Sequence, residues 1–80
     1  MPKIAEDGKY SIRVHLRNEH PPPHVHIYYD GKVKRVSLYD LRVMDPVPAH
    51  EEADLVGLAR KYRMQALVVW AQLNEGRRRK

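Results

Sequence analysis

Three histidines lie close together in a short run that also contains a glutamate and three consecutive prolines. His24 and His26 are two residues apart, so on a β-strand both side chains project from one face, at a spacing that lets two imidazoles reach one metal ion. His20 joins them if the stiff proline loop turns back, and Glu19 then supplies an oxygen ligand or orients an imidazole. These four residues predict a site for a divalent transition metal, and their ligand types suit zinc, nickel, copper or ferrous iron.

The same histidines also belong to a candidate anion-binding surface. If the strands expected at 10–17 and 24–29 pair antiparallel, their polar positions share one sheet face: Arg13, His15, Arg17, His24, His26 and Tyr28. Lys32 and Lys34 of a third strand extend this face if they point the same way. Cations, imidazoles and a phenol without a carboxylate favour phosphate or nucleic acid, and a histidine pair can supply the base and acid of phosphodiester cleavage.

The residues leave the choice between these chemistries open. Histidines on the outer face of a sheet are also compatible with simple solvation, and a proline run is an ordinary rigid loop. Tyr28 is the only aromatic side chain expected on the face, so there is little platform for stacking single-stranded RNA. Binding is therefore favoured over catalysis, and the residues do not decide whether the chain is an enzyme. A purely structural role of the histidines remains an alternative.

The elements that position these residues are strands in the first half of the chain. Apolar and polar residues alternate over 10–17 and 24–29, and Asp30-Gly31 is a strong signal for a hairpin leading into a third strand over 32–38. Val33 is out of phase with Val36, which indicates either a bulge near Lys34-Arg35 or an edge strand with poor patterning. Residues 39–44 form either a fourth strand or an irregular connection.

From Asp45 onwards the signals are helical. Asp45 can cap a helix that starts between 45 and 50, and Gly76 is a natural stop. Between them, apolar residues recur at spacings of three and four, which predicts one long helix over about 50–74: Leu55, Leu58, Ala59, Tyr62, Ala66, Val69, Trp70 and Leu73. The expected core combines this stripe with the inward strand positions: Tyr10, Ile12, Val14, Leu16, Val25, Ile27, Leu55, Leu58, Tyr62, Val69 and Trp70.

The last two turns of this helix are apolar on the opposite side as well, at Met64, Leu67, Val68 and Ala71. At about 1.5 Å per residue, the helix is longer than strands of about seven residues, so its end overhangs the sheet. A domain of this size has too little mass to bury both helix faces. We therefore expect a homodimer or a protein partner on this surface, unless the helix bends or another segment covers it.

Composition bounds the remaining possibilities. The 80 residues are 42% hydrophobic and 31% charged and include no cysteine, which predicts one soluble, cytoplasmic domain over 1–76, without disulfides, thiolate metal sites or a membrane-spanning helix. The formal net charge is +5, and the tail 77–80 contributes four positive charges. This tail is either disordered and solvated or an electrostatic contact for phosphate.

The run Glu19 to His26 also carries a resemblance to a known family. With Met1, Pro2, Ile4, the Asp30-Gly31 turn and Trp70, it resembles small bacterial proteins that form a domain-of-unknown-function family with the motif Glu-His-Pro-Pro-Pro-His-Val-His. Many members of that family are encoded beside another small protein, in pairs that resemble toxin–antitoxin or regulator systems. The resemblance therefore implies a protein partner, and it implies no particular activity.

Together these features predict a small α+β fold: a three-stranded antiparallel β-meander, or a four-stranded one, packed against one long C-terminal helix. The expected function is a binding module of a two-protein system, with the histidine and arginine face as its ligand site and the helix as its interface. The alternative is a hydrolytic, nuclease-like or metal-binding protein centred on His20, His24 and His26.

Overall fold

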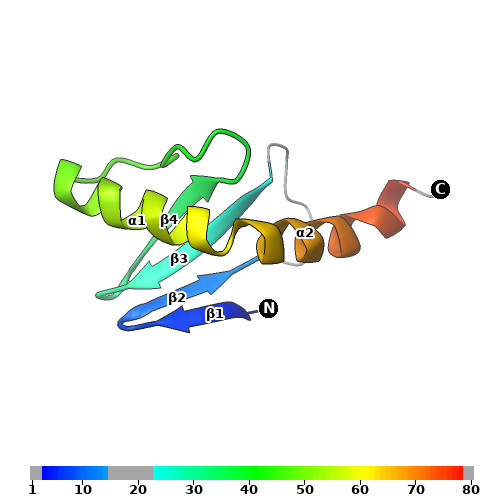
Figure 1. Cartoon of the computed structure of the whole chain (residues 1–80), viewed down its shortest axis with the longest axis horizontal. Coiled ribbons are helices and arrows are strands. Elements are labelled where there is room, and N and C mark those ends of the chain that lie inside the picture. The colour runs from blue at the N-terminus through cyan, green and yellow to red at the C-terminus, as the bar shows by residue number, and fades with distance from the viewer. Residues whose placement is uncertain (1–2, 15–22, 79–80) are drawn as a thin grey trace.

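The computed structural model describes residues 3–14 and 23–78, with side chains described as far as Gln72. It is an α+β fold in which a four-stranded antiparallel sheet lies against two helices (Figure 1). The elements follow in the order β1 (Lys3–Asp7), β2 (Tyr10–Arg13), β3 (His24–Tyr29), β4 (Lys32–Ser37), α1 (Ala49–Lys61) and α2 (Arg63–Arg78). Neighbouring strands are consecutive in the chain, so the predicted antiparallel meander is confirmed, but its fourth strand is not the predicted one.

The fourth strand is β1, and the segment 39–44 is not a strand. Gly8 and Lys9 connect β1 to β2, and Gly8 has a φ of 60°, which glycine adopts without strain at the first position of a hairpin turn. The segment 39–44 instead contributes an isolated bridge between Val36 and Val43. β1 was not predicted because three of its five residues are charged and leave no clear alternation.

The hairpin between β3 and β4 forms at Asp30-Gly31 as predicted, with φ angles of 49° and 73°. Of the two alternatives for this strand, the edge strand with poor patterning is observed and the bulge near Lys34-Arg35 is not, because β4 lies at the sheet edge and pairs with β3 without a shift. Val33 is out of phase for a different reason: it pairs with Tyr28 on the sheet face away from α1 and is 41% exposed. The sheet's register shift lies in β1, between Lys3 and Ala5.

The outer edge of β4 is covered by the segment that leads to α1. Ser37 N–H donates to the carbonyl of Arg42 and Met44 N–H to that of Arg35, each over 2.8 Å. Asp45 accepts hydrogen bonds from the backbone and guanidinium of Arg35, so it does not cap the helix as predicted. α1 begins at Ala49, after Pro48, without a side-chain cap.

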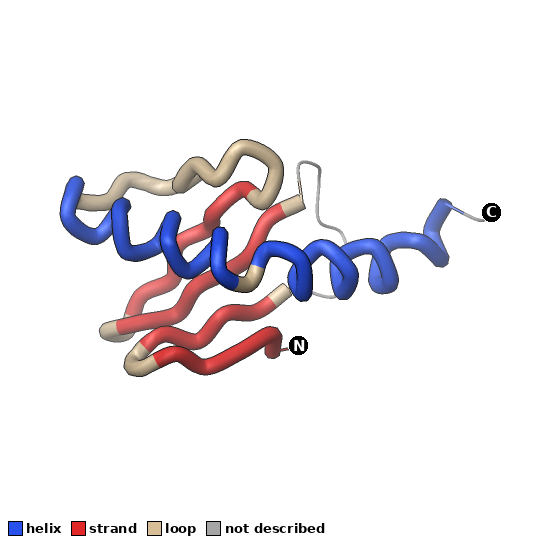
Figure 2. The backbone as a smooth tube through the Cα atoms, in the orientation of Figure 1, coloured by secondary structure: helices blue, strands red, loops and turns tan. Residues whose placement is uncertain are grey.

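The single long helix that the sequence predicts is interrupted at Tyr62, where φ is −106° and ψ is 14° (Figure 2). The interruption is held from both sides: Tyr62 Oη donates to Asp7 Oδ2 over 2.9 Å, and Arg63 Nε donates to the carbonyl of Leu38 over 2.7 Å. α2 then continues through Gly76 to Arg78, so the predicted stop at Gly76 is also wrong. Neither helix has the length and apolar content that crossing a bilayer requires.

The core lies between the sheet and the helices. Its fully buried side chains come from β2 to β4 and their ends, and from one face of the helices: Ile12, Val14, Val25, Ile27, Tyr29, Val36, Leu38, Leu55, Ala59 and Ala66. The predicted core residues Tyr10, Leu58, Tyr62, Val69 and Trp70 pack against it half-buried, and Leu16 lies outside the described residues. Leu73 lies outside the described side chains, and the rest of the helical stripe is confirmed as the face that meets the sheet.

Candidate functional site

The two histidines of β3 lie on the same side of the strand, as their spacing predicts. Their ring centroids are 5.2 Å apart. His26 pairs with Arg13 of β2 and with Arg35 of β4, and directly opposed residues of an antiparallel sheet share a face. The predicted grouping of Arg13, His24, His26 and Tyr28 on one face is therefore confirmed as an arrangement in space.

Two expectations about this face are wrong, and the direction of Lys32 and Lys34, which the sequence leaves open, is away from it. His24 and His26 are only 4% and 8% exposed, so they are not part of an open surface. Lys32 and Lys34 pair with Tyr29 and Ile27 and so lie on the opposite face, and Arg35 is the cation that β4 contributes. The face also carries a carboxylate, because Asp45 Oδ1 binds Arg35 Nη2 over 2.8 Å.

His24 contacts a side chain that comes from α2. The ring of Trp70, from α2, lies with its centroid 5.3 Å from that of His24. This contact joins the first residue of β3 to the helix that extends past the sheet. Alternation along β3 reports which face His24 occupies, but it carries no information on a side chain that arrives from α2.

Arg13 is held in place by its neighbours on the same face. Its guanidinium carbon lies 5.4 Å from the ring centroid of Tyr28, and its Nε donates to Ser11 Oγ over 3.1 Å. Arg35, in contrast, forms an ion pair with Asp45. Its hydrogen bonds hold the pKa of the Asp45 carboxyl below its usual value. Among the described residues Arg13 forms no ion pair.

The other predicted ligands of this face, His15, Arg17, Glu19 and His20, lie outside the described residues. Within residues 3–14 and 23–78 no group of three potential metal ligands is present. The predicted metal site and the predicted anion surface therefore stay predictions.

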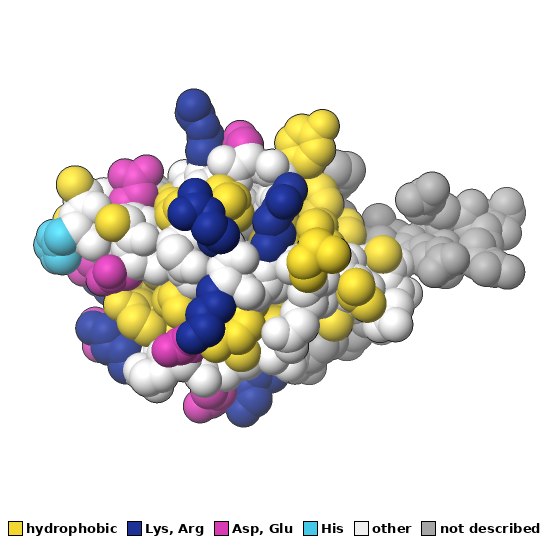
Figure 3. Space-filling view, in the orientation of Figure 1, with side chains coloured by type: hydrophobic (Ala, Val, Ile, Leu, Met, Phe, Trp, Pro, Cys, Tyr) yellow, Lys and Arg dark blue, Asp and Glu magenta, His cyan; other side chains and the backbone are white. Residues whose placement is uncertain are grey.

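The second candidate site is the outer face of α2. Met64 is 74% exposed, Val68 is 54% exposed and Ala71 is also exposed, as the sequence predicts. Leu67 differs, because it is half-buried and packs against the core. Figure 3 shows hydrophobic side chains gathered over this part of the molecule. We call Met64, Val68 and Ala71 the α2 stripe.

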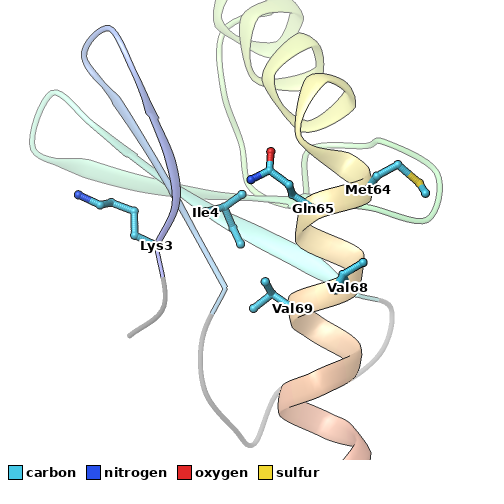
Figure 4. Close-up of a pocket in the computed structure, with 6 residues that line it drawn as sticks. All are labelled: Lys3, Ile4, Met64, Gln65, Val68 and Val69. Carbon is cyan, nitrogen blue, oxygen red and sulfur yellow. The ribbon is translucent and has the colours of Figure 1, made fainter.

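An open groove of about 430 Å³ runs beside the α2 stripe (Figure 4). Met64, Gln65, Val68 and Val69 line it from α2, and Lys3 and Ile4 line it from β1. The register of β1 shifts between Lys3 and Ala5, and such an irregularity re-aims a side chain; Ile4 lies at this point and lines the groove opposite α2 (Figure 4). The groove was not predicted because β1 was not predicted, although Asp7-Gly8 resembles the turn signal at Asp30-Gly31.

Comparison with known proteins identifies a family and no function. A family model described as Domain of unknown function (DUF4160) matches residues 10–71, and the chain belongs to this family. The expected membership in a domain-of-unknown-function family is confirmed at that level. No curated protein and no solved structure matches the chain.

Proposed function

We propose that this member of the family is a protein-binding module that acts through the α2 stripe and the adjoining groove. The observation that carries the proposal is the exposure of Met64 and Val68 on a helix whose other face is already packed on the sheet. Contiguous apolar surface of this kind is typical of protein interaction sites, because its burial removes hydrocarbon from water.

The local electrostatics support a protein rather than a nucleic acid at this position. Residues 64–72 include no charged side chain, although 31% of the whole chain is charged. Nucleic-acid binding depends on cations that neutralise phosphates, and the α2 stripe offers none. Lys3, at the groove, is already paired with Glu6 over 3.0 Å. The groove therefore suits apolar side chains.

A two-protein regulatory or toxin–antitoxin-like setting is the biological context that we propose for this binding. It draws on the resemblance to proteins encoded in adjacent pairs. In that setting the protein encoded next to this one is one candidate for the α2 stripe, beside a second copy of the chain, and the location is the bacterial cytoplasm. The histidine and arginine face remains as a second surface, on which Arg13 is the residue positioned to meet a phosphate or nucleic acid.

The experiment is co-purification of the tagged chain with two separate candidates, the protein encoded by the adjacent gene and an untagged copy of the chain itself. Met64→Asp places a charge on the α2 stripe, and we expect it to abolish capture of whichever candidate binds. Val33→Asp is the matched control, because Val33 is also an exposed apolar residue but lies on β4. Capture that survives Met64→Asp, or capture of neither candidate, would overturn the proposal.

Metal binding is the second candidate function, and the 5.2 Å separation of the His24 and His26 rings favours it. Zinc is the probe, followed through the imidazole resonances in NMR spectra, with the exposed His50 as an internal control. Joint changes of His24 and His26 at about one equivalent of zinc support a shared site. Unchanged resonances at that ratio exclude it and leave the histidines with a structural role.

A further inference from the structure

We infer that the occupant of the α2 stripe is a second copy of this chain, which packs its own α2 antiparallel against the first. The inference rests on the proposed function and names the partner of that same surface. It makes the chain a twofold-symmetric dimer, the commonest symmetry among soluble oligomers.

The first step is that the α2 stripe points directly away from its own core. Successive helical residues are about 100° apart, so Met64, Val68 and Ala71 fall within roughly one-sixth of the helix circumference. Ala66 is fully buried, and Trp70 is half-buried against the core on the opposite side. α2 extends beyond the sheet (Figure 2), and Met64 and Val68 are 74% and 54% exposed, so the described elements of the same chain leave the α2 stripe uncovered.

The part of α2 that carries the α2 stripe is uncharged. A partner with an acidic docking segment would need cations to meet, and residues 64–72 provide none. A second copy meets this uncharged stretch with an identical one, so no like charges are brought together in the contact. The polar residues of the stretch are Gln65 and Gln72, both exposed, which suits the rim of an interface.

The third step concerns size. When two identical helices pack antiparallel about an axis between residues 67 and 68, each Met64 lies opposite Ala71 of the second copy. The largest side chain of the α2 stripe then faces the smallest, and Val68 faces the half-buried Leu67. Alternation of large and small residues across facing positions is how helix surfaces interlock. The α2 stripe is therefore complementary to itself in this register.

The contact is short, which sets the expected strength. Residues 64–72 span about two and a half helical turns, and a stable interface usually buries about 1,600 Å² in total. We expect a dimer at about 100 µM that becomes increasingly monomeric on dilution, because dissociation follows mass action.

Sedimentation velocity on the full chain, over a range of concentrations, tests the inference. Met64→Ala leaves a gap opposite Ala71, and Ala71→Met forces two methionines together, so each single variant should weaken the dimer at least tenfold. The double variant, Met64→Ala with Ala71→Met, exchanges the two sizes and should restore association to within about threefold of the original. Circular dichroism confirms that each variant is folded.

A chain that is monomeric at every concentration overturns the inference, and so does a dimer that the double variant does not restore. These failures are distinguishable from failure of the proposed function. If the chain is monomeric but captures the adjacent-gene protein through Met64, the α2 stripe is a binding surface and only its occupant was misassigned.

Discussion

The hydroxyl of Tyr62, where the helix is interrupted, donates a hydrogen bond to Asp7 Oδ2 over 2.9 Å. Lys61 Nζ binds the same carboxylate oxygen over 2.9 Å. The junction between α1 and α2 is thus tied to the end of β1. The groove lies between β1 and α2. Asp7, the last residue of β1, therefore ties the start of α2 to the strand that forms the other wall of the groove.

This junction predicts acid sensitivity. The hydrogen bond from Lys61, followed by that from Tyr62, lowers the pKa of Asp7 below its ordinary value of 3.8. The stability that Asp7 contributes is therefore fully present above that value and is lost as pH falls through the lower folded-state pKa. In urea unfolding below pH 3.8, the free energy of unfolding should fall less for Asp7→Asn than for the original chain. Equal losses would show that the junction carries no such linkage.

A second titration belongs at the alkaline end. Burial, followed by its hydrogen bond to Glu51, raises the pKa of Tyr29 from 10.0 to about 12. Because the folded state resists loss of this proton, the stabilisation is fully present below pH 10 and is lost as pH rises towards 12. Ultraviolet absorbance should show one tyrosine ionising last, and Tyr29→Phe should remove it. A titration unaffected by Tyr29→Phe would contradict the assignment.

The contact between His24 and Trp70 makes a spectroscopic prediction. His24→Ala removes the ring that packs on the indole, so Trp70 fluorescence should shift to longer wavelength and unfolding should become easier by about 1–3 kcal/mol. His50→Ala is the control, because the His50 side chain is 80% exposed. An unchanged emission maximum in His24→Ala would mean that His24 does not fix the tryptophan.

Much of this fold follows from the sequence because burial on one face enforces a period. Alternation identified the inward positions Ile12, Val25 and Ile27, and spacings of three and four identified Leu55 and the rest of the helix face that meets the sheet. The Asp30-Gly31 turn was predictable because its residues adopt positive φ, which few other pairs tolerate.

The remainder depends on contacts between elements that are distant in sequence. At the helix interruption Tyr62 contacts Asp7, and no local pattern near residue 62 encodes a strand at the other end of the chain. The contact of His24 with Trp70 likewise joins residues that are far apart in the sequence. For the candidate sites, the α2 stripe was predictable from its own apolar residues, whereas the Ile4 wall of the groove needed a register shift in β1.

Two substitutions on the helices should have opposite effects: one lowers the free energy of unfolding and the other prevents association. Leu55→Ala opens a cavity in the core and should cost about 2–5 kcal/mol of unfolding free energy, with association unaffected where the chain is folded. Val68→Asp changes an exposed position, so it should alter stability by no more than about 0.5 kcal/mol while abolishing association. Urea unfolding and sedimentation velocity measure the two quantities. A Val68→Asp protein that is strongly destabilised would show that this residue serves folding instead.

Binding through the α2 stripe is tested most directly by NMR spectra of isotope-labelled methionine methyl groups. The spectra are recorded as the chain is concentrated and then as the adjacent-gene protein is added. Met64 lies on the α2 stripe, whereas Met44 is 37% exposed before α1 and serves as an internal control. We predict that the Met64 methyl resonance shifts with binding while the Met44 resonance does not. If sedimentation shows a complex while the Met64 resonance stays constant, the complex does not form through the α2 stripe.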